Sequence, residues 1–90
     1  MQIEFDPHKR QLTWQKRRLD FARAAEVFAG STLNWRDDRT DYGEPRWITF
    51  GLLDARWVVV VWTPRGAARR IISMRRANDR EITAYAQRLG

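Results

Sequence analysis

One apolar run constrains the fold of this chain more than any other feature of its sequence. Residues 57–62 are four valines between two tryptophans, so an extended chain here would carry apolar side chains on both faces. Such a segment suits a central strand of a sheet better than an edge strand. We therefore predict a β-sheet in which the segment 56–63 is a central strand.

Further strands are predicted on both sides of this segment. Polar and apolar residues alternate near the N-terminus, as they do in a half-buried strand. Aromatic and aliphatic runs between turn-forming residues indicate the other strands. The predicted set comprises strands over 2–5, 33–36, 46–53, 56–63 and 67–75, turns near Asp54 and over Pro64–Gly66, and a polar loop over 37–45.

Capping residues mark the starts of two helices. Asp6 can cap a helix whose first residue is Pro7, and this helix should run to about Arg18. Asp20 can cap a second helix, which carries a stripe of apolar residues at i, i+3, i+4 and i+7 and should end near Gly30. The first helix has few apolar residues, so we expect most of its surface to face solvent or a ligand.

A capping box opens a third helix. The Asn78 side chain can accept a hydrogen bond from the backbone of Glu81, and the Glu81 carboxylate can accept one from Asn78. The predicted order of elements is then β-α-α-β-β-β-β-α. This order indicates an α+β fold in which helices pack on one face of a mainly antiparallel sheet.

The size of the chain and its lack of cysteine narrow the class of protein. Ninety residues suit one small domain, which we expect to span 1–90. The absence of cysteine excludes a disulfide framework, a thiol nucleophile and a cysteine-ligated zinc site. No apolar stretch approaches the length of a membrane span, and the N-terminus lacks the pattern of a signal peptide. We therefore expect a cytoplasmic protein that makes no membrane contact.

Positive charge gathers in two segments that contain no acidic residue. Residues 8–18 hold two lysines and three arginines, and residues 65–76 hold five arginines. Arginine binds phosphate or carboxylate bidentately and stacks on bases, whereas lysine acts as a point charge. The two segments together predict a polyanion or an acidic protein as the partner.

Few catalytic mechanisms are open to such a chain. With one histidine and no suitable acidic cluster, the sequence predicts neither a metal site nor a nucleophilic triad, and we expect no cofactor. Metal-free RNA cleavage stays open because the nucleophile is the substrate's own 2′-hydroxyl, so the protein has only to align it, stabilise charge and move two protons. Arginine suits the charge stabilisation, and the proton-transferring group stays open among His8, Lys16, Tyr42, Glu44 and Tyr85.

The tryptophans of the predicted strands divide into two groups. Trp57 and Trp62 lie in the central apolar run, where aromatic side chains pack into a core. Trp47 follows Arg46 at the end of the polar loop, where core packing and stacking against an RNA base are equally open.

Four segments of the chain form a recognisable pattern: Ile3–Lys9, Leu19–Phe28, Gly43–Trp47 and Arg70–Asn78. Together they resemble the BrnT family of bacterial type II toxins, and the Ile-Ile-Ser-x-Arg-x-Ala run in the last segment is the most specific part. The resemblance implies a fold similar to RelE-type ribonuclease toxins and RNA cleavage that arrests translation. It also implies neutralisation by a BrnA-like antitoxin, through which the pair would bind operator DNA.

The resemblance also points to particular basic residues. Lys16 and Arg75 match the family pattern, whereas Arg65 is added from its charge and position alone. We predict that these three residues are catalytic and that Arg75 clamps the scissile phosphate together with Arg65 or Arg76. Many relatives have Lys-His-Gly at positions 16–18, so here arginine replaces a histidine and the helix loses its glycine stop. The predicted RNA-binding residues are Arg17, Arg18, Arg70, Arg76, Arg80 and Trp47.

Two other functions fit the same basic surface. The chain could be a non-catalytic subunit of a toxin–antitoxin repressor complex, in which case it would bind an acidic antitoxin segment without cutting RNA. A general single-strand-binding protein would bind RNA without cut products and without a dedicated partner.

Overall fold

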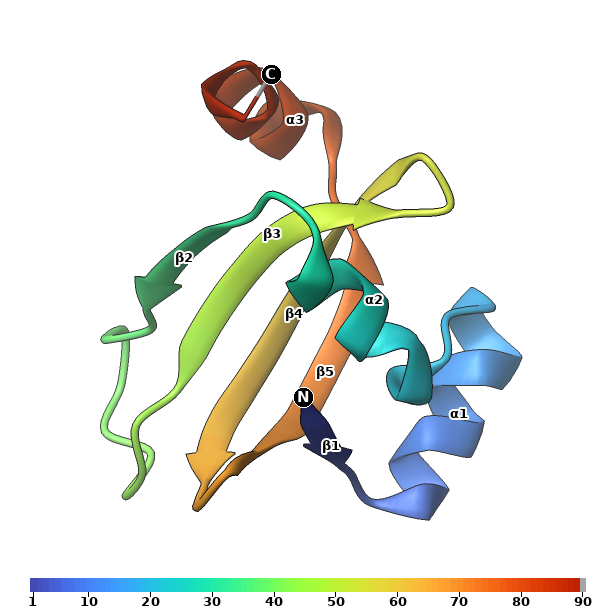
Figure 1. The fold of residues 1–90 in the computed structure, drawn as a ribbon, viewed down its shortest axis with the longest axis vertical. Coiled ribbons are helices and arrows are strands. Elements are labelled where there is room, and N and C mark those ends of the chain that lie inside the picture. The colour runs from blue at the N-terminus through green and yellow to red at the C-terminus, as the bar shows by residue number, and fades with distance from the viewer. Residues whose placement is uncertain (90) are drawn as a thin grey trace.

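The computed structural model describes residues 1–89, and its elements follow the predicted order (Figure 1). None of the helices in this range is long and apolar enough to cross a membrane. The elements are β1 (Gln2–Glu4), α1 (Pro7–Arg17), a 3₁₀ turn (Phe21–Arg23), α2 (Ala24–Ala29), β2 (Leu33–Arg36), β3 (Trp47–Leu53), β4 (Arg56–Arg65), β5 (Ala68–Arg76), α3 (Asp79–Tyr85) and a final 3₁₀ turn (Ala86–Arg88).

All five strands form one sheet in the order β1-β5-β4-β3-β2. The apolar run 57–62 lies in β4, the middle strand, as its composition predicts. β1 pairs with β5 in parallel, and the other neighbouring pairs are antiparallel. The α+β class and the mainly antiparallel sheet are therefore confirmed.

The turn between β4 and β5 differs from the prediction. Pro64 and Arg65 continue β4 and pair with Arg69 and Ala68, so that the turn lies at residues 66–67. A proline is tolerated here because β3 begins opposite Trp62, which leaves β5 as the one neighbouring strand at this level. The prediction of a turn over Pro64–Gly66 was wrong because it took the proline as the end of the strand, although β4 has only one neighbouring strand at this level.

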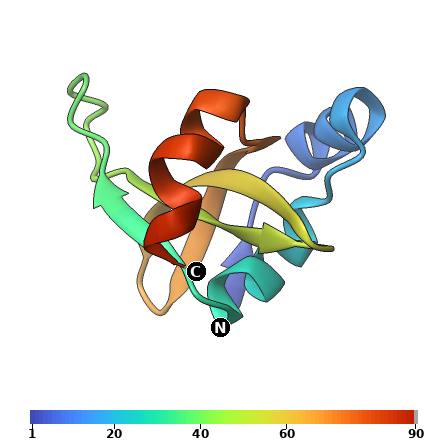
Figure 2. The same cartoon turned by 90° about the horizontal axis from the view of Figure 1, so that it is seen from above.

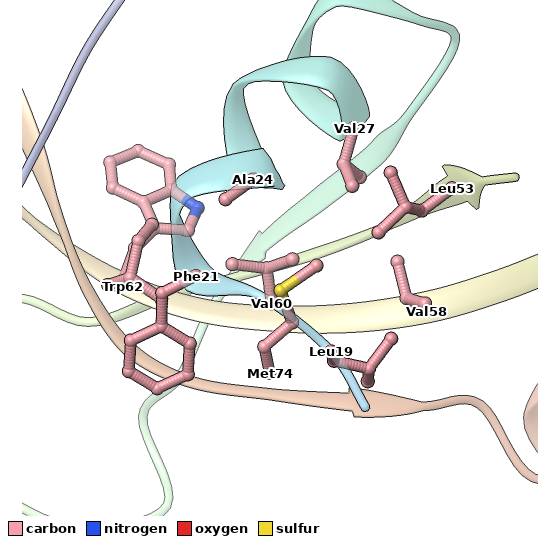
Figure 3. Close-up of a cluster of buried hydrophobic side chains, with 10 residues drawn as sticks. Leu19, Phe21, Ala24, Val27, Leu53, Val58, Val60, Trp62 and Met74 are labelled. Atoms are coloured by element: carbon pink, nitrogen blue, oxygen red, sulfur yellow. The ribbon is translucent and has the colours of Figure 1, made fainter. Parts of the chain in front are cut away.

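One face of the sheet, the α2 face, is covered by α2 and by the chain that leads into it. Its core contains Phe21 and Val27, which belong to one cluster with Val58, Val60 and other buried side chains (Figure 3). Gly51 allows the close approach, because a Cβ at this position would lie 2.9 Å from a methyl group of Val27. The predicted second helix forms as a 3₁₀ turn followed by six residues of α2.

The opposite face, the α3 face, is covered in part by α3. The Tyr85 ring lies 5.5 Å from the Phe50 ring and 5.1 Å from the Trp35 ring, measured between centroids. The expectation that all helices lie on one face was therefore wrong. The physical reason is that Phe50 and Val59 are buried apolar residues that point away from α2, so this side of the sheet also needs cover, and Tyr85 of α3 packs on Phe50. Figure 2 shows α3 and α2 on opposite sides of the sheet.

Candidate functional site

Arginines of β4 and β5 line up on the α3 face. In the antiparallel ladder Arg75 lies opposite Val59, and Arg70 lies opposite Thr63. Positions 59, 61 and 63 of β4 share one side of the sheet, so their partners Arg75, Ser73 and Arg70 share it too. An irregularity between Val61 and Trp62 adds a residue to β5 at this point. We call the surface formed by Arg65, Arg70, Ser73 and Arg75 the basic face.

Arg75 is held in place by Glu81 at the start of α3. Its two terminal nitrogens donate to the two carboxylate oxygens of Glu81, each at 2.7 Å. The same carboxylate accepts from the backbone N–H of Asn78, which completes the predicted capping box. The two hydrogen bonds between Arg75 and Glu81 hold the pKa of Glu81 below its usual value, and they raise the pKa of Arg75. The guanidinium is thus charged and oriented.

Lys16 lies beside the same part of β5. α1 runs along β5 beyond the short strand β1, and Arg17 donates to the carbonyl oxygen of Met74 at 3.0 Å. This contact fixes the end of the helix, where Lys16 faces a groove shared with Ile72 and Ser73. Ser73 is two residues from Arg75 on the same side of the strand, about 7 Å away along the chain. The structure therefore brings Lys16 into the neighbourhood of Arg75.

Neither of the two predicted companions of Arg75 lies beside it. Arg76 lies opposite Val58, so its side chain leaves from the α2 face. Arg65 lies opposite Ala68, and Ala68 precedes Arg75 by seven residues. About 20 Å of strand therefore separates the backbone of Arg65 from that of Arg75. Arg65 instead lies 3.6 Å from Glu44, and Arg70, nearer to Arg75, pairs with Glu4 at 3.3 Å.

Three of the predicted RNA-binding residues lie away from the basic face. Arg18 and Arg76 line a depression of about 390 Å³ beside the turn that contains Asp54. Trp47 lies on the α2 face, where its half-buried ring stacks on Trp62 at 6.1 Å between centroids. Trp57 stacks on Phe50 on the α3 face, so both tryptophans of the central run pack against other aromatic rings.

Arg80 is exposed in the first turn of α3, immediately before Glu81. The other groups considered for proton transfer are spread over the molecule. His8 is exposed at the start of α1, Tyr85 packs against Trp35 and Phe50, and Tyr42 donates to Asp37. Within residues 1–89, no group of three His, Asp or Glu side chains gathers in a way that could hold a metal ion.

Sequence reasoning missed an ordered cluster in the loop between β2 and β3. Arg39 binds the buried Asp37 carboxylate with two hydrogen bonds of 2.8 Å, and these lower the pKa of Asp37 to about 2. The charge of Arg39 opposes the rise in the pKa of Arg75. Figure 2 shows this green loop rising on the same side of the sheet as α3. No spacing signal in the sequence distinguishes Asp37 from the other loop carboxylates.

The fold and the site together define a small α+β protein whose sheet presents arginines on one face, with a lysine beside them. A family model described as the ribonuclease toxin BrnT of type II toxin–antitoxin systems matches residues 5–81, a span that contains Lys16, Arg75 and Glu81. The chain therefore belongs to the BrnT family of ribonuclease toxins, which confirms the resemblance seen in the sequence. A comparison with curated proteins gives no match.

Proposed function

We propose that this chain is an endoribonuclease that cuts RNA on the basic face without a metal ion. The observation that carries the proposal is the placement of Arg75, which is charged, fixed by Glu81 and close to the part of β5 that Lys16 faces. Preorganised cations of this kind stabilise the extra negative charge of a phosphorane-like transition state. Family membership supplies the class of reaction.

In the proposed reaction the 2′-hydroxyl oxygen of one nucleotide attacks the adjacent phosphorus. The bond from phosphorus to the 5′-oxygen of the next nucleotide breaks, which leaves a 2′,3′-cyclic phosphate and a 5′-hydroxyl. The proton of the 2′-hydroxyl goes to a base, and the leaving oxygen gains one. Arg75 would bind the non-bridging oxygens, and Lys16 would stabilise charge or move a proton.

The rest of the basic face would hold the RNA backbone on one side of the reacting phosphate. Arg70 and then Arg65 continue away from Arg75 along the β4–β5 hairpin. The ion pairs of Arg65 and Arg70 are partly exposed, so phosphate can replace their carboxylates at small cost. Arg17 would act mainly by holding α1 against β5. Arg18, Arg76, Arg80 and Trp47 would contact RNA only if it extends beyond the basic face.

Cleavage of messenger RNA would arrest translation in the cytoplasm. Membership of a type II family implies an antitoxin partner. We propose that this partner resembles BrnA, neutralises the toxin by direct binding and carries the complex to operator DNA. The whole chain, residues 1–90, would act as a single toxin domain.

A direct test begins with the chain separated from any partner under denaturing conditions and refolded. It is then incubated with mixed-sequence RNA in EDTA, and the new ends are mapped. The proposal predicts ends with 2′,3′-cyclic phosphate and 5′-hydroxyl groups. Cleavage that appears only after a divalent cation is added, or that leaves 5′-phosphate ends, would contradict it.

A non-catalytic basic subunit of a repressor complex is the second candidate. The feature that favours it is Arg17, because the resemblance to the BrnT family implies a histidine at this position and a guanidinium is a poor proton acceptor. Expression of the chain without its antitoxin separates the two functions. The ribonuclease arrests growth and the repressor subunit does not.

A further inference from the structure

A groove between α1 and β5 differs in chemistry from the rest of the basic surface. It has a volume of about 310 Å³ and is lined by residues of α1 and β5, the two elements labelled in Figure 1. We call it the α1 groove, and its lining residues are Lys9, Leu12, Thr13, Lys16, Arg17, Ile72 and Ser73.

The α1 groove has an aliphatic floor. Leu12 is 38% exposed, although it lies on a helix that is otherwise mostly polar. Ile72 is half-buried at the irregularity in β5, where it has no partner in the register of β4. Two aliphatic side chains from different elements thus form one apolar surface that α1 leaves open.

The rim of the α1 groove is cationic and includes no carboxylate. Among residues 1–89, neither Lys9 nor Lys16 forms an ion pair, whereas Arg10 on the same helix pairs with Asp20 at 2.7 Å. Arg70 and Arg75 on the neighbouring strand also have acidic partners. The groove is therefore a place where positive charge is left uncompensated around an apolar floor.

We propose that the α1 groove receives an acidic segment of the antitoxin. An aliphatic side chain of that segment packs on Leu12 and Ile72, and flanking carboxylates bind Lys9 and Lys16. An apolar centre with a charged rim is the usual anatomy of a protein interface. RNA fits less well, because single strands gain affinity by stacking on aromatic rings and the groove has none.

This inference rests on the proposed function in one respect, because Lys16 belongs to both surfaces. A segment seated in the α1 groove covers Lys16 and so keeps RNA away from the neighbouring Arg75. Neutralisation would then follow from occupation of the groove, without a change in the fold of the toxin.

The test compares Leu12→Glu with Leu52→Glu. Both leucines are exposed, at 38% and 45%, but Leu52 lies on β3, away from the groove. The antitoxin is co-expressed with this chain and then purified away from it. Calorimetry measures the affinity of each variant for this antitoxin, and RNA cleavage by each variant is measured without antitoxin. We expect Leu12→Glu to weaken antitoxin binding at least about tenfold, since a carboxylate would meet an acidic segment. Leu52→Glu should bind as the wild type does.

A second variant, Lys9→Glu, reverses the charge of the rim without changing the floor or Lys16, and it should weaken antitoxin binding in the same direction. Equal antitoxin affinity of Leu12→Glu and the wild type would overturn the proposal. So would loss of RNA affinity in Leu12→Glu with antitoxin affinity retained, because the groove would then be an RNA contact. If the wild-type chain cuts no RNA while Leu12→Glu loses the antitoxin, the docking surface stands and the proposed ribonuclease function fails.

Discussion

Arg18 ends α1 in the left-handed backbone region, with φ of 56°. A side chain with a Cβ pays about 1 kcal/mol in this region, and glycine does not. We expect Arg18→Gly to raise the free energy of unfolding by about 0.5–1 kcal/mol, as measured by urea denaturation. Arg18→Ala is the control, since it keeps the backbone cost and loses only the guanidinium over Trp14. Equal stability of the two variants would show that backbone conformation is not the cause.

Asp37 should make stability depend on pH in a defined window. Hydrogen bonds from Arg39 lower its pKa in the folded protein from 3.8 to about 2. A lowered folded pKa contributes stability above the unfolded value, and this contribution is lost as the pH falls towards the folded value. Asp37→Asn should therefore be less stable than the wild type at pH 7, and the difference should shrink between about pH 4 and pH 2. Unfolding curves over pH 2–7 test this, and a constant difference would refute it.

At the scale of elements, α3 depends on its capping box for both its start and the placement of Arg75. The Asn78 side chain accepts from the backbone of Glu81 at 2.8 Å. We expect Asn78→Ala to lower the free energy of unfolding by about 1 kcal/mol, because a backbone N–H at the start of the helix loses its acceptor. Asn78→Asp keeps an acceptor and should stay near the wild type in the same denaturation experiment. Equal losses in both variants would argue against the cap.

Helix starts and the central strand could be predicted because their signals are local. Asp6, Asp20 and Asn78 all cap the elements that the sequence assigned to them. The position of α3 could not be predicted, since it depends on the fact that Phe50 and Val59 need cover on the far side of the sheet. The parallel pairing of β1 with β5 joins residues far apart in the chain, and no local pattern encodes it.

At the scale of the whole molecule, alternation across the sheet sorts the arginines onto two faces. The basic character of 65–76 was evident from composition, but the face of each arginine was not. The irregularity near Ile72 shifts the alternation within β5, so Arg70 and Arg75 share a face although they are five residues apart. Arg76 directly follows Arg75 in the regular part of the strand, so it leaves from the other face, although the sequence suggested it as a companion of Arg75.

The placement of the arginines on the two faces of the sheet predicts how RNA affinity responds to salt concentration. Each phosphate neutralised by a cation releases counterions, so affinity falls with salt concentration. Removing Arg70 from the basic face should weaken RNA binding and reduce the slope of log affinity against log salt by about 0.7–1. Titrations of RNA into wild type and Arg70→Ala at several salt concentrations measure this slope. An unchanged slope would mean that Arg70 touches no phosphate.

We propose above all that RNA is cleaved on the face of the sheet where Arg75 lies. The most direct measurement compares the rate of RNA cleavage in EDTA for Arg75→Ala and Arg56→Ala, with folding checked by circular dichroism. Arg56 is an exposed arginine at the start of β4, and its partner in the ladder, Leu53, belongs to the core of the α2 face, so Arg56 leaves the sheet from the face opposite to Arg75. The account predicts a loss of about 100-fold or more for Arg75→Ala and a change of less than about twofold for Arg56→Ala. Equal rates for the two folded variants would contradict it.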